Sequence, residues 1–185
     1  MADRIVQYGH PVLRCKAEPV GRISPAVRRL AQRLADALAE SGGLGVAAPQ
    51  IGEPLRMFVY HDKGDGALVT AIDPQLVKVE GEIIEVEGCL SLRRLYGNVK
   101  RAQRVVVKAK TLGGKRITLT GEGMNARILQ HELDHLDGVL FVDRVDPDTL
   151  HWVVGEPDAS GELHKEQTTL QDALKVFELR MAGRQ

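Results

Sequence analysis

Apolar residues recur every three or four positions in a stretch that begins after Ser24-Pro25. The apolar positions are Val27, Leu30, Leu34 and Leu38. Serine followed by proline is typical of an N-cap and a first helical residue, so the pattern predicts a helix over residues 25–40. Gly42 follows as a stop signal. A second helix is predicted over residues 124–136.

Segments rich in valine and isoleucine lie between these helices, separated by glycine-containing turns. The segments predicted as strands are residues 55–60, 68–72, 76–80, 83–87, 105–110 and 116–120. The glycine-rich stretch 42–52 is predicted to be an ordered loop, because Pro49 prevents it from continuing as a helix. Strands and helices segregate along the chain, so the predicted class is α+β. Mostly antiparallel sheets would pack around the helix at 124–136, with an N-terminal and a C-terminal helix beside them.

The C-terminal part of the chain has a different pattern. Residues 146–166 are rich in proline, glycine and acidic side chains and are predicted to form a loop, extended in part around Trp152. Thr168 and Gln171 have the spacing of a capping box ahead of a final helix. The apolar residues on one face of that helix are Leu170, Leu174, Phe177 and Met181. We expect this stripe to pack against the rest of the domain.

Length and composition narrow the class of protein. A chain of 185 residues fits one domain and can fold without disulfides. Its 25 basic and 25 acidic residues give a formal net charge of zero, and no stretch concentrates Lys and Arg, so a nucleic-acid substrate is not indicated. Having only Cys15 and Cys89 is typical of a reducing compartment. Without a leader pattern or an apolar run of membrane-spanning length, we expect a cytoplasmic protein with no membrane partner.

The strongest chemical signal is the run from His131 to His135, which has the pattern HExxH. On a helix, His131 and His135 lie one turn apart on one face and can bind the same metal ion. Glu132 is adjacent to them without being a ligand, so it can accept a proton from a metal-activated water. A purely structural site is the alternative, but it requires a fourth protein ligand and gives Glu132 no role.

The third ligand has to come from elsewhere in the chain. Phe141 stands where the metzincin pattern has its last histidine, and phenylalanine cannot coordinate a metal. Glu156 is at about the distance of a thermolysin-like ligand, but Gly155 and Pro157 disfavour a helix there. Cys89, at the end of a predicted strand, is the better candidate.

Three separated segments together resemble one family, the peptide deformylases. Residues 43–50 resemble its motif GxGxAAPQ, residues 87–91 its motif EGCLS, and residues 130–135 its motif QHExDH. Further similarity extends the resemblance over about residues 4–145. The resemblance implies one deformylase domain over residues 1–185, in which residues 146–185 form a variable C-terminal loop and helix.

The resemblance implies a metal-dependent hydrolase that removes the N-formyl group from the N-terminal methionine of newly synthesised polypeptides and releases formate. Cys89, His131 and His135 would be its metal ligands and Glu132 its general base. The resemblance assigns the stabilisation of the carbonyl oxygen in the transition state to the side-chain amide of Gln50 and the backbone N–H of Leu90.

Other residues are candidates for substrate binding. Gly45 would let the backbone approach an extended peptide. Leu44, Met124, Arg127 and Ile128 could line a pocket for a methionine side chain, although core packing is an equal alternative for Met124 and Ile128. Glu87 is expected to orient a ligand or Gln50.

The resemblance also implies Fe(2+) as the metal in the cell, while a site with a thiolate ligand would bind Zn(2+), Ni(2+) or Co(2+) in purified protein as well. Formyl-methionyl nascent peptides are the implied partners. The family resemblance suggests a ribosome contact near the exit tunnel, but the mixed charges of the last helix do not support docking through it.

The chain departs from the family pattern after the second motif. Arg93 stands where many members have proline, so we expect the loop 93–97 to differ in shape and to carry positive charge at the rim of the site. Two other functions stay open at this point. One is a metallopeptidase that cuts internal peptide bonds and shares HExxH. The other is an inactive relative that keeps the fold and the metal for binding.

Overall fold

The computed structural model describes residues 4–156 and 161–182. Its helices are α1 (Pro25–Ser41), α2 (Met124–Leu136) and α3 (Leu170–Ala182). One sheet has the strand order β1-β2-β3-β6-β7, with β1 Gly45–Ala47, β2 Met57–His61, β3 Leu68–Glu80, β6 Arg104–Lys110 and β7 Arg116–Glu122. The other has the order β4-β5-β8-β9, with β4 Ile83–Cys89, β5 Leu92–Arg101, β8 His151–Val154 and β9 His164–Gln167. The ladders within both sheets are antiparallel, so the predicted α+β class is confirmed.

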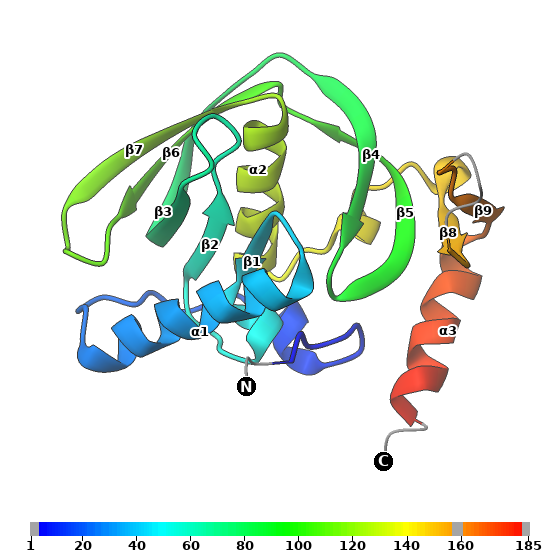
Figure 1. Cartoon of the computed structure of the whole chain (residues 1–185), viewed down its shortest axis with the longest axis horizontal. Helices are drawn as coiled ribbons and strands as arrows, with labels where there is room; N and C mark the ends of the chain where they lie inside the picture. Colours follow the sequence, from blue (N-terminus) through cyan, green and yellow to red (C-terminus); the bar gives the residue numbers. More distant parts are fainter. Residues whose placement is uncertain (1–3, 157–160, 183–185) are drawn as a thin grey trace.

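Helix α2 lies between the two sheets (Figure 1). It begins at Met124 and ends at Leu136, as its sequence pattern predicts. Its apolar residues Leu129, Leu133 and Leu136 pack into a core formed with β2 and β6. This packing fixes the helix against the larger sheet and leaves another face directed toward β4 and β5.

Strand β2 explains how the larger sheet holds a helix on each face. Successive side chains of a strand point to opposite faces. Phe58 and Tyr60 pack with α2, whereas Met57 and Val59 pack with α1. All four are buried. Residues 57–60 are therefore all apolar or aromatic, because neither face of the sheet meets solvent there, and the partly exposed His61 ends the strand.

Helix α1 begins and ends where the sequence predicts. The Ser24 side chain accepts a hydrogen bond from the Val27 backbone N–H at 3.4 Å, which caps the first turn. Gly42 has φ +67°, the left-handed conformation that ends a helix. The glycine-rich stretch that follows was predicted to be a loop throughout. The structure instead contains the short strand β1 there, followed by a 3-10 helix over Ala48–Ile51.

Two segments that were predicted as separate strands form a single strand in the structure. Residues 68–72 and 76–80 belong to the single strand β3, which is irregular between Ile72 and Gln75. Asp73 has φ +49° at this point, and its side chain accepts the Val20 N–H at 2.7 Å and pairs with Lys110 at 2.8 Å. These contacts hold the irregularity in place, so the strand continues past Pro74.

The predicted loop at residues 93–97 is wrong, because these residues belong to strand β5. Leu92, Leu95 and Val99 are fully buried and hold the strand against the core of the smaller sheet. The positive charges of Arg93 and Arg94 hide this strand pattern in the sequence. The pairing of β4 with β5 is irregular at this point. Cys89 pairs with Leu92 while Gly88 pairs with Tyr96, so the two strands form a bulge.

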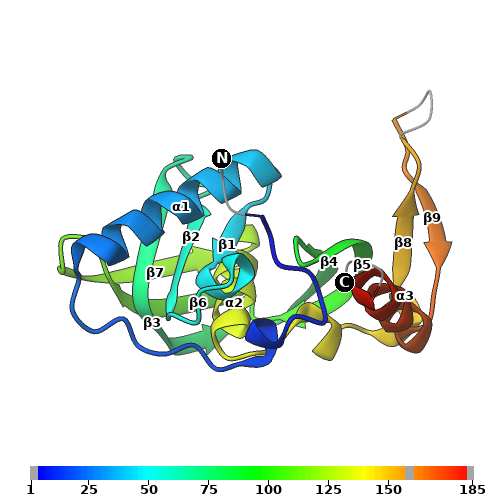
Figure 2. The ribbon, with the colours of Figure 1, turned by 90° about the horizontal axis from the view of Figure 1, so that it is seen from below.

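The C-terminal segment adds a hairpin, β8–β9, to the smaller sheet and then forms α3. Figure 2 shows this segment at the end of the molecule away from the larger sheet. Phe177 is buried and contacts the rings of Tyr8 and Trp152, with centroids 6.0 and 5.4 Å away.

The sequence interpretation of this segment needs three corrections or limits. Strand β8 confirms the extension predicted around Trp152, whereas β9 lies where a loop was predicted. The cap of α3 is Thr169, whose side chain accepts the Asp172 N–H at 3.1 Å, and not Thr168. The side chain of Met181 lies outside the described residues.

Over the described part of the chain, no helix has the length and apolar character to span a membrane.

Candidate metal centre

Helix α2 and the end of β4 bring three metal-binding side chains together. The ligand atoms of Cys89, His131 and His135 lie within 4.8 Å of one another. The Cys89 Sγ is 3.2 Å from His135 Nε2, and the two imidazole rings lie 4.9 Å apart at 76°. The helix supplies two ligands from successive turns, and the smaller sheet supplies the third.

Glu132 lies beside these ligands and is almost completely buried. Its Oε2 atom has no hydrogen-bond partner among the described residues. Burial raises the pKa of Glu132 to about 7, because the surroundings disfavour the charged carboxylate. A carboxyl group with this pKa can both accept and return a proton near neutral pH.

Gly45 makes the position of Glu132 possible. A Cβ atom on Gly45 would lie 2.6 Å from Glu132 Oε1 and 2.9 Å from its Cδ. Real Cβ atoms do not lie this close to other atoms, so any side chain at this position would displace Glu132 or strand β1. The predicted approach of the Gly45 backbone to a peptide stays a prediction, and the structure adds a close approach to Glu132.

The amide of Gln50 is fixed by a backbone contact. Its Oε1 accepts the Ala47 N–H at 2.9 Å. The amide nitrogen therefore points to the second motif, where it lies 3.3 Å from Ser91 Oγ and 3.6 Å from Cys89 Sγ. The N–H donors of the Gln50 amide thus lie next to the metal-binding cluster.

The turn from Cys89 to Ser91 is held by the N-terminal segment. The Gln7 side chain donates to the Leu90 carbonyl oxygen at 3.1 Å, and the Tyr8 N–H donates to the Ser91 carbonyl oxygen at 2.8 Å. The Ser91 N–H in turn donates to Cys89 Sγ at 3.4 Å. Gln7 thus fixes the peptide plane whose N–H contacts the cysteine sulfur. The sequence interpretation missed Gln7, since a single glutamine outside any motif gives no signal.

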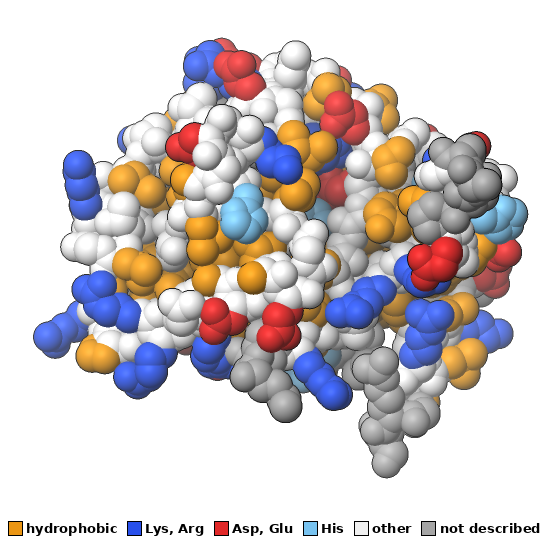
Figure 3. Space-filling view, in the orientation of Figure 1, with side chains coloured by type: hydrophobic (Ala, Val, Ile, Leu, Met, Phe, Trp, Pro, Cys, Tyr) orange, Lys and Arg blue, Asp and Glu red, His pale blue; other side chains and the backbone are white. Residues whose placement is uncertain are grey.

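A groove of about 580 Å³ opens over the cluster. It runs between β1 and β4, each of which is an edge strand of its sheet. Figure 3 shows this face of the molecule, which is hollowed between the surface over α1 and β2 and the surface over β4 and β5. The predicted site residues that line the groove are Leu44, Gly45, Gln50, Cys89, Leu90, Met124, Arg127, Ile128, His131 and Glu132.

The predicted pocket residues differ in exposure. Leu44 and Met124 are exposed, whereas Ile128 is buried and also belongs to the core around α2. Arg127 is buried, and its guanidinium donates to Glu87 at 2.8 Å and to the Val99 carbonyl oxygen at 3.1 Å. Arg127 therefore supports the wall of the groove through these partners.

Glu87 contacts His131, one of the candidate metal ligands. Its Oε1 is 2.7 Å from His131 Nδ1, which leaves Nε2 of that ring for a metal. Arg101 pairs with both carboxylate oxygens at 2.7 and 3.1 Å. Burial raises the pKa of Glu87, but the hydrogen bonds from His131 and Arg101 outweigh it, and the pKa falls well below its ordinary value. The carboxylate is therefore ionised where it meets His131.

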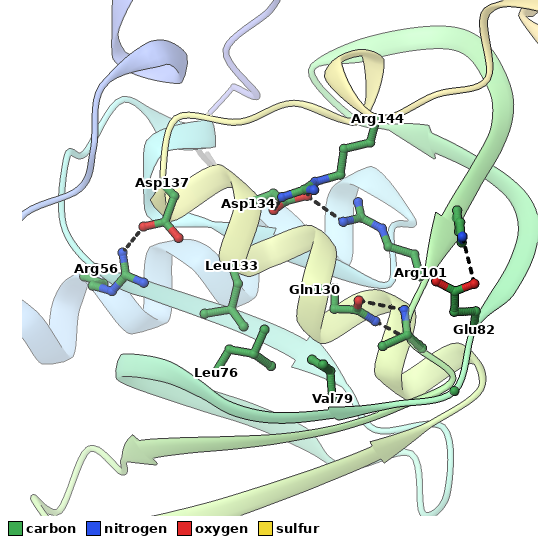
Figure 4. Close-up of a pocket in the computed structure, with 13 residues that line it drawn as sticks. Arg56, Leu76, Val79, Glu82, Arg101, Gln130, Leu133, Asp134, Asp137 and Arg144 are labelled. Atoms are coloured by element: carbon green, nitrogen blue, oxygen red, sulfur yellow. Dashed lines mark hydrogen bonds and ion pairs between the residues drawn. The ribbon is translucent and has the colours of Figure 1, made fainter.

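Behind α2, Arg101 continues into a second ion pair. It donates to Asp134 at 2.6 Å, and Arg144 binds the same carboxylate at 2.7 and 2.8 Å. Figure 4 shows Arg101 and Arg144 both reaching Asp134, above the apolar side chains of Leu76 and Val79. These residues line a second cavity of about 580 Å³ on the side of the helix opposite the groove. The charged residues that border this cavity are paired. Asp137, for example, accepts a hydrogen bond from Arg56 at 2.7 Å.

The residues present fit a single divalent metal ion. One thiolate and two imidazoles are the donors that zinc and other late first-row metals prefer. His131 is oriented by Glu87, as metal-bound histidines usually are. The buried Oε2 of Glu132 has no partner among the described residues, as expected for a group that contacts a water or a substrate at such a site.

Comparisons with known proteins agree with this geometry. The family model described as polypeptide deformylase matches residues 2–150. A peptide deformylase of Thermomicrobium roseum is 42% identical over 166 residues, which cover 85% of this chain and 94% of that protein. A peptide deformylase of Desulforudis audaxviator is 44% identical over 142 residues, covering 76% and 92%.

Solved structures are similar as well. The crystal structure of a peptide deformylase from Legionella pneumophila has a TM-score of 0.76 at 38% identity and covers 80% of this chain and 88% of that one. The structure from Thermus thermophilus has a TM-score of 0.74 at 41% identity and covers 78% and 86%. A structure from Synechococcus elongatus, in complex with actinonin, has a TM-score of 0.74 at 34% identity and covers 77% and 79%.

Proposed function

The chain belongs to the polypeptide deformylase family of hydrolases, and we propose that it removes the N-formyl group from the N-terminal methionine of newly synthesised polypeptides. The observation that carries this proposal is the Cys89, His131 and His135 cluster with the carboxylate of Glu132 beside it, at the base of a groove. The products are formate and a peptide with a free amino group.

Cys89, His131 and His135 would hold one divalent metal ion. When bound, such an ion supplies a Lewis acid that polarises the formyl carbonyl and makes a water molecule more acidic. The family resemblance favours Fe(2+) in the cell, and the donor set also suits Zn(2+), Ni(2+) and Co(2+). Glu87 supports this role because its contact with His131 Nδ1 leaves Nε2 as the ligand atom.

Glu132 would act as the general base and then as the general acid. Its unpaired Oε2 is available to take a proton from the attacking water while the oxygen–carbon bond forms. The same proton would go to the amine nitrogen as the carbon–nitrogen bond breaks. The pKa of about 7 suits both steps, because the group gains and loses a proton near neutral pH.

Gln50 and Leu90 would stabilise the negative charge that develops on the formyl oxygen. The amide nitrogen of Gln50 is directed toward the cluster because its oxygen is already bound to the Ala47 N–H. Leu90 follows Cys89 directly, and the Gln7 contact fixes the conformation of this turn. Donors held in advance in this way lower the barrier more than donors that must reorient.

The substrate would lie extended in the groove between β1 and β4. An extended peptide can form backbone hydrogen bonds with edge strands, and Gly45 brings one such strand next to the reacting group. The methionine side chain would contact Leu44, Met124 and Ile128. Formyl-methionyl nascent peptides are the partners we propose. A ribosome contact stays a prediction.

Formate release from a C-terminally amidated formyl-Met-Ala-Ser peptide tests the proposal, with anaerobically purified, Fe(2+)-loaded protein. We expect turnover by the wild type and a loss of at least about a thousandfold in Glu132→Gln, with metal content unchanged. Equal turnover by Glu132→Gln would contradict the role of Glu132. Cleavage of an unformylated internal peptide bond would favour a metallopeptidase, and no reaction by metal-loaded protein would favour an inactive relative.

A further inference from the structure

Two arginines at the rim of the groove have no partner within the described part of the protein. Arg93 and Arg94 line the groove and are exposed. Neither has an ion-pair or hydrogen-bond partner among the described residues, whereas Arg101, Arg127 and Arg144 near the site all bind carboxylates. Arg93 and Arg94 therefore form a positively charged rim.

The bulge between β4 and β5 holds this rim in place. Because Cys89 pairs with Leu92 and Gly88 with Tyr96, residues 93–95 bulge out of the ladder. Leu95 is fully buried and anchors the bulge. Arg94 has φ +67°, an uncommon conformation for a residue with a side chain. The two guanidinium groups are thereby presented at the groove by a segment fixed on both sides.

The acidic residues of the groove do not cancel this charge. Glu87 is buried and paired with Arg101 and Arg127, so its charge is already neutralised. Glu132 is buried beside the candidate metal ligands, so its carboxylate does not extend to the rim. Glu40, near the end of α1, is exposed and also lines the groove, but one carboxylate against two arginines leaves a positive excess. The formal net charge of the chain is zero, so this excess is local.

The chemistry of the substrate determines what such a rim can recognise. A formylated amino terminus is uncharged, and methionine has a neutral side chain. The first charges that a formyl-methionyl peptide can bring to the groove are therefore on the side chains that follow. In an extended peptide, three residues span about 10 Å, so these side chains lie near the rim when the formyl group is at the metal site.

We propose that Arg93 and Arg94 make this enzyme prefer formyl-methionyl peptides that carry Asp or Glu in the first three positions after methionine. This inference rests on the proposed deformylase function and adds a substrate preference to it. Exposed ion pairs are individually weak, so the expected preference for an acidic over a basic peptide is about three- to tenfold in kcat/KM. It should arise mainly from KM, because the rim contacts the substrate away from the reacting atoms.

The test compares three formyl-Met peptides with the same length and an amidated carboxyl end, so that side chains alone differ in charge. Positions two to four carry alanine, glutamate or lysine. In the wild type, we expect glutamate to give the highest kcat/KM and lysine the lowest. Raising the salt concentration to about 1 M should remove most of the difference, because exposed charges are screened.

Arg93→Glu/Arg94→Glu should reverse the order of the charged peptides, so that the lysine peptide has a higher kcat/KM than the glutamate peptide. A matched control is Arg28→Glu/Arg29→Glu, which makes the same charge change in exposed neighbours on α1. These residues lie about 18 Å along the helix from its end at Ser41, which lines the groove, so they are beyond the screening length. The control should keep the wild-type order.

The outcomes separate the preference from the function. Hydrolysis of all three peptides with equal kcat/KM would overturn the preference alone, and so would an order that persists in Arg93→Glu/Arg94→Glu. An equal shift in the α1 control would assign the effect to overall charge and also overturn it. If metal-loaded protein hydrolyses none of the peptides, the proposed function fails and the preference fails with it.

Discussion

Gly45 and Glu132 approach each other so closely that a Cβ atom at residue 45 would lie 2.6 Å from the glutamate carboxylate. Gly45→Ala must therefore displace Glu132 or strand β1. A displacement of about 1 Å at a reacting group can lower turnover by about a hundredfold, which is the loss we expect in formate release. Metal content, measured by elemental analysis, should stay at the wild-type level because the three atoms nearest to the added Cβ all belong to Glu132 and none to a candidate metal ligand.

The control for this variant is Gly113→Ala. A Cβ atom at Gly113 would have Thr111 Oγ1 at 3.6 Å as its nearest neighbour, which is an ordinary contact. Turnover should remain within about twofold of the wild type. Full activity in Gly45→Ala would mean that the carboxylate does not need its observed position.

The burial of Glu132 predicts a dependence of stability on pH in the metal-free protein. Its pKa rises from 4.5 in the unfolded chain to about 7 in the folded protein. A raised pKa means that this group's contribution to stability is fully present below about pH 4.5 and is lost as the pH rises through about 7. Glu132→Gln has no carboxyl group to titrate at this position. As the pH rises between those limits, the free energy of unfolding of the wild type should therefore fall by about 3 kcal/mol relative to that of the variant.

Urea unfolding of chelator-treated protein at pH 4 and pH 8.5 measures this difference. Glu122→Gln is a suitable control, because the side chain of Glu122 is 72% exposed and should show no comparable change. Parallel pH profiles for the wild type and Glu132→Gln would show that the folded state does not raise the pKa of this carboxyl group.

Glu87 and Glu85 allow a matched test of metal binding. Both lie on β4 and both pair with Arg127, but only Glu87 contacts His131. Removing a group that orients a metal-bound histidine typically costs 10- to 100-fold in metal affinity. Glu87→Gln should therefore weaken Zn(2+) binding by that factor in a competition with a chelator, whereas Glu85→Gln should change it less than about threefold. Equal effects would remove the special role of the His131 contact.

Arg101 and Arg144 should differ strongly in their effect on stability. Arg101 is buried and joins Glu87 to Asp134, so Arg101→Met leaves two carboxylates short of a partner inside the protein. Breaking a buried ion pair in this way typically costs about 3–5 kcal/mol. The Arg144 side chain is 47% exposed, and Arg144→Met should cost about 1 kcal/mol or less. Chemical denaturation measures both, and similar losses would contradict the proposed importance of burial.

The sequence predicted best those elements whose pattern is local and regular. Helix α2 has the predicted ends because helical spacing extends over its whole length. Strand β1 was missed because three residues in a glycine-rich stretch are too few to form a pattern. Strand β5 was missed because its buried residues acquire their partners only when the C-terminal segment packs against them.

The same distinction applies to the site. The residues that resemble family motifs, such as Cys89 and His131, could be selected before the structure was known, and the structure brings them together. Gln7 and Arg101 lie outside the three segments that resemble the family motifs. Gln7 contacts a residue 83 positions away, and Arg101 contacts Glu87 and Asp134 from another strand. Single polar residues with such distant partners are identified only once the chain is folded.

The candidate metal ligands come from two parts of the fold, since Cys89 belongs to the smaller sheet and the histidines belong to the helix that packs on the larger sheet. The sulfur of Cys89 and the ring of His135 meet across 46 positions of sequence. An ion held by both binds the folded chain and not the unfolded one. When the free ion concentration is about a thousand times its Kd, binding stabilises the folded state by about 4 kcal/mol. The supply of metal in the cell would then govern how many copies of the protein survive proteolysis, before the turnover of any one copy is considered.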